Sequence, residues 1–378
     1  MAGEPGFDEM ALRQFGQQIG RLLMGESLTR EETYQAYKAI LNNEQPDLQQ
    51  GAFMAALHGK HANPAELAGV WQAFQEVDIN HQTITTPEPF VEIAGTGADS
   101  LKTLNISTGA AIIAAAAGAY VAKKGAPAIT GKAGTADTFA ALGIETMAPL
   151  SQVARSVETI GLGFAHAFSA HSAKLGRILS QIRFPSSITI VGPLTNGFNA
   201  KRQVLGVFMP PLTGLVAALA KEIGFERVLV PCGHSAEHPD RFIDEYSNIG
   251  PTSVTELKAD GSIHNYILTP ADLGLKQYRY EDIATGDDAV ANAKMIADVL
   301  SGRDQGAKRD VLCLNAGAVL YLADKAKDIG DGYDKALAAV ESGKGLEKLR
   351  QLILTQNADP AAGLATLEKL IGSPVATV

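Results

Sequence analysis

Apolar positions recur at helical spacing through roughly the first 86 residues of the chain. Phe15, Ile19, Leu22 and Leu23 fall on one face of a helix, and no strand-like run interrupts the stretch. The starts of further helices are marked by the capping or proline residues Thr29, Pro46-Asp47 and Asn63-Pro64. A layer of helices this thin must pack on something else. The pattern predicts a small helical domain over residues 1–86.

A different pattern begins after the proline-containing boundary at residues 85–89. Short, apolar, β-branched runs then alternate with longer helical patterns. The predicted strands are Val91–Ala94, Ala119–Lys123, Ser187–Val191, Arg227–Val230 and Asp310–Leu314. This alternation predicts an α/β domain with a mostly parallel central sheet over residues 87–378. Such sheets bind ligands in the loops that follow the carboxyl ends of their strands, so those loops are the candidate sites.

Composition and charge narrow the classes of function. With 378 residues, 46% of them apolar, the chain is long enough for two domains with ordinary cores. The 32 basic and 41 acidic residues leave a net charge of −9, which argues against nucleic acid or an anionic membrane as the main partner. A phosphorylated small molecule is not excluded, because backbone N–H groups and one or two lysines can hold phosphate in an acidic protein.

Cysteine usage and the apolar runs bear on location. Only Cys232 and Cys313 occur, so no disulfide framework is expected and a reducing compartment is favoured. The N-terminal residues have no basic start and no apolar stretch, unlike a signal peptide. The longest apolar run, Ala110–Ala122, is about two-thirds of a membrane span. We therefore expect a soluble, cytoplasmic protein that is not bound to membranes.

The loop after the first predicted strand is the strongest candidate for a phosphate site. Gly95–Asp99 carries two closely spaced glycines, which let backbone N–H groups approach a phosphate. Side-chain donors follow at the mouth of an Ala-rich helix, at Thr103, Asn105, Ser107 and Thr108. A tight turn before an ordinary capped helix is the alternative, but the whole cluster favours phosphate. No Gly-Lys-Ser/Thr follows, so this is not a Walker loop.

Two later segments suit the same ligand. The second predicted strand ends in Lys123-Lys124-Gly125, which places an ammonium at the carboxyl edge of the sheet, where a pyrophosphate could use it. A further Gly-rich loop over residues 130–137 precedes another helix. Adjacent carboxylates at Asp244 and Glu245 suit a hard divalent cation shared with phosphate oxygens. Taken alone, the lysines could be a solvated strand end and the acids a plain acidic loop.

Taken together, these segments resemble those of the anthranilate phosphoribosyltransferase family over nearly the whole chain. The matching segments are Met24–Glu32, Gly95–Asp99, Asn105–Thr108, Gly192–Asn196, Arg202–Val207, Asp244-Glu245, Gly250–Thr252, Arg309–Leu312 and Leu314–Ala316. So many ordered matches at compatible spacing are a specific signal. The resemblance implies the nucleoside phosphorylase/phosphoribosyltransferase class of fold: a helical N-terminal domain that makes homodimer contacts, and a larger α/β domain.

The resemblance also implies roles for individual residues. Phosphoribosyl pyrophosphate would be held by Gly95, Asp99, Thr103, Asn105, Ser107, Thr108, Lys123, Gly125 and Thr135. Mg²⁺ would be held by Ser107, Asp244 and Glu245, and the acceptor would lie by Gly95, Ala126 and Leu179. The implied enzyme moves 5-phosphoribosyl to an aromatic amine, most simply anthranilate in tryptophan biosynthesis, and releases pyrophosphate. No acid or base is assigned, since an aromatic amine is already neutral at pH 7.

The residues implied to bind the acceptor depart from the family pattern, which leaves alternative functions open. The family usually reads Lys-His-Gly-Asn-Arg where this chain has Lys123–Pro127, so Ala126 replaces an acceptor-contacting asparagine and Pro127 an arginine. Leu179 stands where the family has an arginine that pairs with the anthranilate carboxylate, and Ala98 replaces a glycine of the first loop. The alternatives are the same donor with a different acceptor, or a non-catalytic homologue that binds nucleic acid or another ligand.

Overall fold

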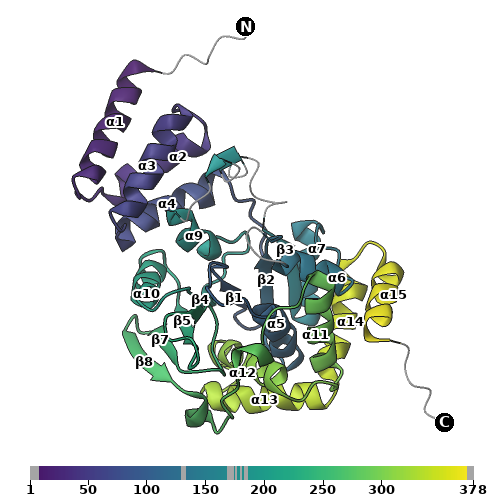
Figure 1. Cartoon of the computed structure of the whole chain (residues 1–378). Coiled ribbons are helices and arrows are strands. Elements are labelled where there is room, and N and C mark those ends of the chain that lie inside the picture. Colours follow the sequence, from purple (N-terminus) through teal and green to yellow (C-terminus); the bar gives the residue numbers. More distant parts are fainter. Residues whose placement is uncertain are drawn as a thin grey trace, which may run out of the picture. The chain divides into compact units, whose positions relative to one another are not determined.

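The computed structural model describes residues 8–128, 133–167, 174, 177–178, 181–182 and 186–372 (Figure 1). The chain forms two compact units. The helical unit takes the chain up to His81, the described part of His171–Gly197, and Ala218–Gly224. The α/β unit takes the rest, so the helical unit recruits two segments that lie far beyond residue 86.

The helical unit is built from elements that begin where capping residues predicted. Its helices are α1 (Glu9–Leu23), α2 (Arg30–Leu41), α3 (Asp47–Gly59), α4 (Pro64–Val77) and α9 (Ser187–Val191), followed by the 3₁₀ turn η1 (Gly192–Leu194). Thr29 caps α2 by accepting from the N–H of Glu32 at 3.1 Å, while the Glu32 carboxylate accepts from Thr29 N–H at 2.7 Å. Asn63 and Glu66 repeat this capping box at α4.

The predicted strand Ser187–Val191 is wrong, because these residues form helix α9. Ser186 caps the helix by accepting from the N–H of Ile188 at 3.3 Å, and Ser187 shares a hydrogen bond of 2.6 Å with the buried Tyr37 hydroxyl. A five-residue apolar run is too short for its period to separate a strand from a buried helix turn. Packing on α4 decides between them.

The α/β unit contains one sheet of eight strands in its described residues. The strands are β1 (Val91–Gly95), β2 (Val121–Gly125), β3 (Leu162–His166), β4 (Arg202–Gly206), β5 (Arg227–His234), β6 (Phe242–Ile243), β7 (Thr252–Leu257) and β8 (Ile263–Leu268). The order is β3-β2-β1-β4-β5-β7-β8, with β6 paired to β5. Strands β1 to β5 run parallel, whereas β7 and β8 are antiparallel. This confirms the predicted α/β class with a mostly parallel sheet.

Helices pack on the sheet, and the buried side chains of helices and strands together form the core of the α/β unit. These helices are α5 (Ile106–Ala116), α6 (Thr135–Ala141), α7 (Leu150–Ile160), α11 (Ala289–Leu300), α12 (Ala307–Leu322), α13 (Ile329–Glu341), α14 (Lys344–Gln356) and α15 (Pro360–Ile371). Helix α10 (Leu212–Glu222) belongs partly to each unit. The larger core cluster holds α5 and α12, and a smaller cluster holds the buried side of α7. Val121 joins the first cluster and Ala122 the second, as the alternation of a strand requires.

The predicted strand Asp310–Leu314 is also wrong, because it lies inside the 16-residue helix α12. This helix packs against both α5 and α13 and is buried along almost its whole length. Its apolar residues therefore run together instead of following a helical stripe. In the described part of the chain, no helix is long and apolar enough to cross a membrane.

Candidate functional site

The predicted donor loops meet at the carboxyl ends of β1 and β4 in the α/β unit. Asp244 is 6% exposed and lies against Gly95, where a Cβ would stand 2.6 Å from the carboxyl carbon of Asp244. Its Oδ2 accepts hydrogen bonds from the N–H of Gly97 at 2.6 Å and from the hydroxyl of Thr96 at 3.1 Å. The first loop therefore wraps the carboxylate of Asp244, and burial raises the pKa of this acid despite the hydrogen bonds.

Glu245 reaches the start of α5 from the same segment. Its Oε1 accepts from the N–H of Ser107 at 3.2 Å, near the positive end of the helix dipole. Its Oε2 is buried and has no hydrogen-bond partner. Burial and then the nearby charge of Asp244 raise the pKa of Glu245 well above its ordinary value, against the opposing effect of Lys123. A buried carboxylate oxygen without a partner is costly unless a cation faces it.

Lys123 lies beneath this pair of acids and is 1% exposed. Its ammonium donates to the carbonyl of Ile93 at 2.8 Å and to the hydroxyl of Ser107 at 3.3 Å. Burial lowers the pKa of Lys123 to about 8, although the neighbouring Glu245 and Glu92 favour its charged form. Lys123 therefore contacts the start of α5 through the hydroxyl of Ser107.

Asp99 stands at the end of the first loop and pairs with Lys102 at 2.7 Å. Burial, and then the charge of Asp244, raise the pKa of Asp99 to about 7, while Lys102 acts to lower it. Two acids are therefore held close together in a poorly solvated place. Such an arrangement favours a ligand that brings positive charge to the loop.

The remaining predicted donor residues surround the start of α5 and the start of α6. Asn105 precedes α5, donates to the carbonyl of Ala133 at 3.3 Å and accepts from the hydroxyl of Thr138 at 2.7 Å. The Thr108 hydroxyl is buried without a hydrogen-bond partner. Thr103 donates to the carbonyl of Leu104 at 3.1 Å. Gly125 and Thr135 touch, so a side chain at Gly125 would overlap Thr135.

The predicted acceptor residues are less completely placed. Ala126 follows β2, and its carbonyl accepts from the N–H of Ala136 at 3.0 Å. Leu179 lies outside the described residues. Arg177, one of the basic side chains near that position, is engaged within the helical unit, where it donates to Asp47 at 2.9 Å and to Gln50 at 2.7 Å.

Three residues of the site carried no role in the sequence interpretation. Thr96 binds Asp244 and Lys102 pairs with Asp99, and both lie within or beside the predicted loop. Gly206 ends β4 and pairs with Gly95 in the sheet, directly under the main chain of Asp244. The only sequence feature that could have indicated Gly206 is the match of Arg202–Val207 to the family pattern.

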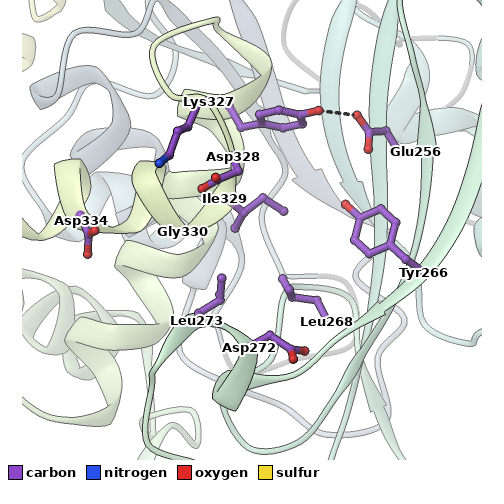
Figure 2. Close-up of a pocket in the computed structure, with 11 residues that line it drawn as sticks. Glu256, Tyr266, Leu268, Asp272, Leu273, Lys327, Asp328, Ile329, Gly330 and Asp334 are labelled. Atoms are coloured by element: carbon purple, nitrogen blue, oxygen red, sulfur yellow. Dashed lines mark hydrogen bonds between the residues drawn. The ribbon is translucent and has the colours of Figure 1, made fainter.

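A separate cavity of about 470 Å³ lies between the β7–β8 end of the sheet and α13. Figure 2 shows Glu256 and Tyr266 on the sheet side facing Lys327, Asp328 and Ile329. None of the predicted donor residues lines this cavity. Two of its acids bind other parts of the fold: Asp328 caps α13, and Glu256 accepts from the hydroxyl of Tyr321 at 2.8 Å. Across the described residues, no three side chains of His, Cys, Asp or Glu are grouped so that they could hold a metal ion.

Comparisons with known proteins agree with this architecture. The profile of the glycosyl transferase family, a/b domain, matches residues 87–346, and that of the family's helical bundle domain matches residues 17–77. An anthranilate phosphoribosyltransferase of Anaeromyxobacter dehalogenans (strain 2CP-C) is 37% identical over 342 residues, covering 89% of this chain and 96% of that protein.

Solved structures give the same result. The crystal structure of anthranilate phosphoribosyltransferase from Thermus thermophilus matches with a TM-score of 0.80 and 30% identity, covering 90% of this chain and 99% of that one. The Saccharomyces cerevisiae enzyme in complex with phosphoribosyl pyrophosphate and Mg shares the fold, with a TM-score of 0.80 and 22% identity over 92% of this chain and 99% of that one. This chain therefore belongs to the anthranilate phosphoribosyltransferase family of glycosyl transferases.

Proposed function

We propose that this chain transfers 5-phosphoribosyl from phosphoribosyl pyrophosphate to anthranilate, with release of pyrophosphate, as a step of tryptophan biosynthesis. The observation that carries the proposal is the buried Asp244-Glu245 pair held by the Gly95–Asp99 loop and by Ser107 at the carboxyl ends of β1 and β4. This pair lies where α/β sheets bind their ligands. Family membership supports the same reaction.

The donor would be held by the loop between β1 and α5 and by the neighbouring β2–α6 region. The proposed residues are Gly95, Asp99, Thr103, Asn105, Ser107, Thr108, Lys123, Gly125 and Thr135. The start of α5 carries the positive end of the helix dipole, which favours phosphate oxygens nearby. The buried Thr108 hydroxyl, which lacks a partner, can bind a ligand oxygen at the same place.

Mg²⁺ fits the oxygens at this site, and Ser107, Asp244 and Glu245 would hold it. The unpartnered, buried Oε2 of Glu245 fits a cation, and carboxylate and hydroxyl oxygens are ligands that Mg²⁺ prefers. Two carboxylates and a hydroxyl suit an ion whose remaining ligands are substrate phosphates and water. When bound, the ion would neutralise negative charge on the departing pyrophosphate.

The proposed reaction exchanges one bond at C1 of the ribose. The C1–oxygen bond to pyrophosphate breaks and its electron pair leaves with the pyrophosphate. The amine nitrogen then bonds to C1 and releases a proton to solvent. Lys123 donates to Ser107, and its positive charge would stabilise the negative charge that develops on the departing pyrophosphate. The rest of the catalysis is positioning of the two substrates.

The test is product formation from defined substrates. The chain is incubated with phosphoribosyl pyrophosphate, Mg²⁺ and anthranilate, and mass spectrometry looks for phosphoribosyl-anthranilate while a coupled assay follows pyrophosphate. Both products should appear together and disappear when the donor, anthranilate or Mg²⁺ is withheld. Absence of both with all components present would remove the proposal.

A different aromatic amine is the second candidate for the acceptor, favoured by Ala126 and Pro127 where the family has Asn and Arg. A panel of aromatic amines in the same assay separates the two, because the true acceptor gives the largest kcat/KM. We also propose a cytoplasmic homodimer that forms through the helical unit. Size-exclusion chromatography with light scattering tests the dimer.

A further inference from the structure

The segment after Asp244 is buried although it forms no helix or strand. Every residue from Glu245 to Gly250 is buried. Buried segments of this kind must satisfy their backbone groups by other means, since no sheet neighbour or helix turn does so. Here side chains supply several of these bonds: Thr252 accepts from Ser247 N–H at 2.9 Å, and the Ser247 hydroxyl accepts from Ile249 N–H at 3.1 Å.

Asn315 on α12 plays this part for Tyr246, the residue next to Glu245. Its Oδ1 accepts from the N–H of Tyr246 at 3.0 Å, and its Nδ2 donates to the carbonyl of Tyr246 at 3.0 Å. The same Nδ2 donates to the carbonyl of Val311 at 2.9 Å, which ties the amide to its own helix. Asn315 is fully buried, so water does not compete for these bonds.

These hydrogen bonds help to position the neighbouring acid Glu245. An amide that binds both polar groups of one backbone residue fixes that residue much as a neighbouring strand would. Tyr246 follows Glu245 directly, so its fixed backbone sets the direction from which the Glu245 side chain reaches Ser107. Helix α12 is in turn packed on α5, the helix that carries Ser107. Helix α5 carries Ser107, and helix α12 holds the residue after Glu245. The packing of these two helices therefore positions both partners of the Ser107–Glu245 hydrogen bond.

We propose that Asn315 is a positioning residue of the donor site, which holds Asp244 and Glu245 at the spacing that Mg²⁺ and phosphoribosyl pyrophosphate require. The inference rests on the proposed function. Groups that orient metal-binding side chains without touching the metal commonly change metal affinity by about 10–100-fold when they are removed. Asn315 belongs to that class. It lies in the segment Leu314–Ala316, whose pattern alone indicates no role for it.

The chain offers a matched control in Gln356, at the end of α14. Its Oε1 accepts from the N–H of Phe164 at 2.9 Å, and its Nε2 donates to the carbonyl of Phe164 at 2.9 Å and of Glu145 at 3.1 Å. Gln356 is 1% exposed. The chemistry therefore matches that of Asn315. Phe164, however, is also held by its pairing with Lys123 in the sheet, whereas Tyr246 lies outside any strand.

The experiment compares Asn315→Leu with Gln356→Leu in the full chain. Calorimetry measures phosphoribosyl pyrophosphate binding across a series of Mg²⁺ concentrations, and melting temperatures are recorded alongside. Both variants should melt earlier than the wild type. Asn315→Leu should raise the Mg²⁺ concentration for half-maximal donor binding by about tenfold or more, and Gln356→Leu should leave it within about twofold.

The outcomes separate the two proposals. If the wild type binds the donor and Asn315→Leu binds it with unchanged Mg²⁺ dependence, the positioning role is wrong while the proposed function stands. If the wild type does not bind the donor with Mg²⁺, the proposed function fails and this inference fails with it. Should Asn315→Leu not fold, Asn315→Ser replaces it: it is neutral, and too short to bind both groups of Tyr246 at once.

Discussion

Gly206 on β4 lies so close to the main chain of Asp244 that a side chain on Gly206 would overlap the Asp244 carbonyl group. The paired glycine of β1, Gly95, faces the carboxylate of the same residue. Two adjacent strands thus end in glycines that together form a shelf for Asp244. Asp244 can lie this close to the ends of β1 and β4 only because neither position carries a side chain.

Gly206→Ala should therefore damage both stability and donor binding. The added methyl group would meet backbone atoms, which cannot move aside as a flexible side chain can. We expect the free energy of unfolding to fall by about 1–3 kcal/mol, as for other overpacked sites. Urea unfolding and donor calorimetry measure the two effects. Gly214→Ala is the control, because nothing lies within 4 Å of a Cβ on Gly214 in helix α10. Unchanged unfolding and binding in Gly206→Ala would contradict the shelf.

Asp244→Asn should reduce activity while keeping the fold. The amide oxygen of Asn can still accept from the N–H of Gly97 and the hydroxyl of Thr96, but the negative charge is lost. We expect kcat/KM to fall about a hundredfold, equivalent to about 3 kcal/mol of transition-state stabilisation. Steady-state release of pyrophosphate measures it. Asp240→Asn, a change at an exposed acid just before β6, is the control. Equal rates in both variants would remove Asp244 from the mechanism.

Glu66→Gln should destabilise the helical unit through a buried ion pair. Glu66 is fully buried and accepts from the ammonium of Lys60 at 2.8 Å and from the backbone N–H of Leu28 at 2.9 Å. Neutralising it leaves the Lys60 charge without an opposite charge, with the Ser27 hydroxyl at 3.2 Å as its remaining hydrogen-bond partner, and we expect a loss of about 3–5 kcal/mol in urea unfolding. Glu9→Gln breaks the exposed pair with Arg13 and should cost less than about 1 kcal/mol. A similar small effect in both variants would show that Lys60 finds another partner.

Asp78 should make stability fall as pH rises through the weakly acidic range. Burial raises the pKa of Asp78 to about 6, against the opposing effect of Lys174, and its Oδ2 has no hydrogen-bond partner. The native state therefore favours the protonated acid, so the stabilisation is present below about pH 4 and is lost as pH rises through 6. Urea unfolding between pH 4 and 7 should show Asp78→Asn gaining on the wild type as pH rises. A difference between the two proteins that stays constant between pH 4 and 7 would contradict this. Asp334→Asn, a change at an exposed acid, is the control variant.

Much of the local structure was predictable because it depends on neighbours in sequence. Thr29 and Asn63 cap the helices that they were expected to start, since a capping box involves residues only three apart. The loop Gly95–Asp99 follows a strand as predicted, because glycine and proline positions limit where a regular element can continue. The predicted strands at Ser187–Val191 and Asp310–Leu314 were wrong, because a short apolar run has the same pattern in a buried helix and in a strand.

Spacing, capping and turn chemistry act over a few residues, so the order of amino acids was enough to predict the helical N-terminal part, the α/β class and the loops that carry phosphate-binding residue types. Which distant residues meet could be seen only in the folded chain. Gly206 lies under Asp244, and Asn315 holds Tyr246 across 69 positions of the chain. Such contacts arise when helices and strands bury their apolar faces together, and this packing depends on the whole fold and leaves no periodic trace in the sequence.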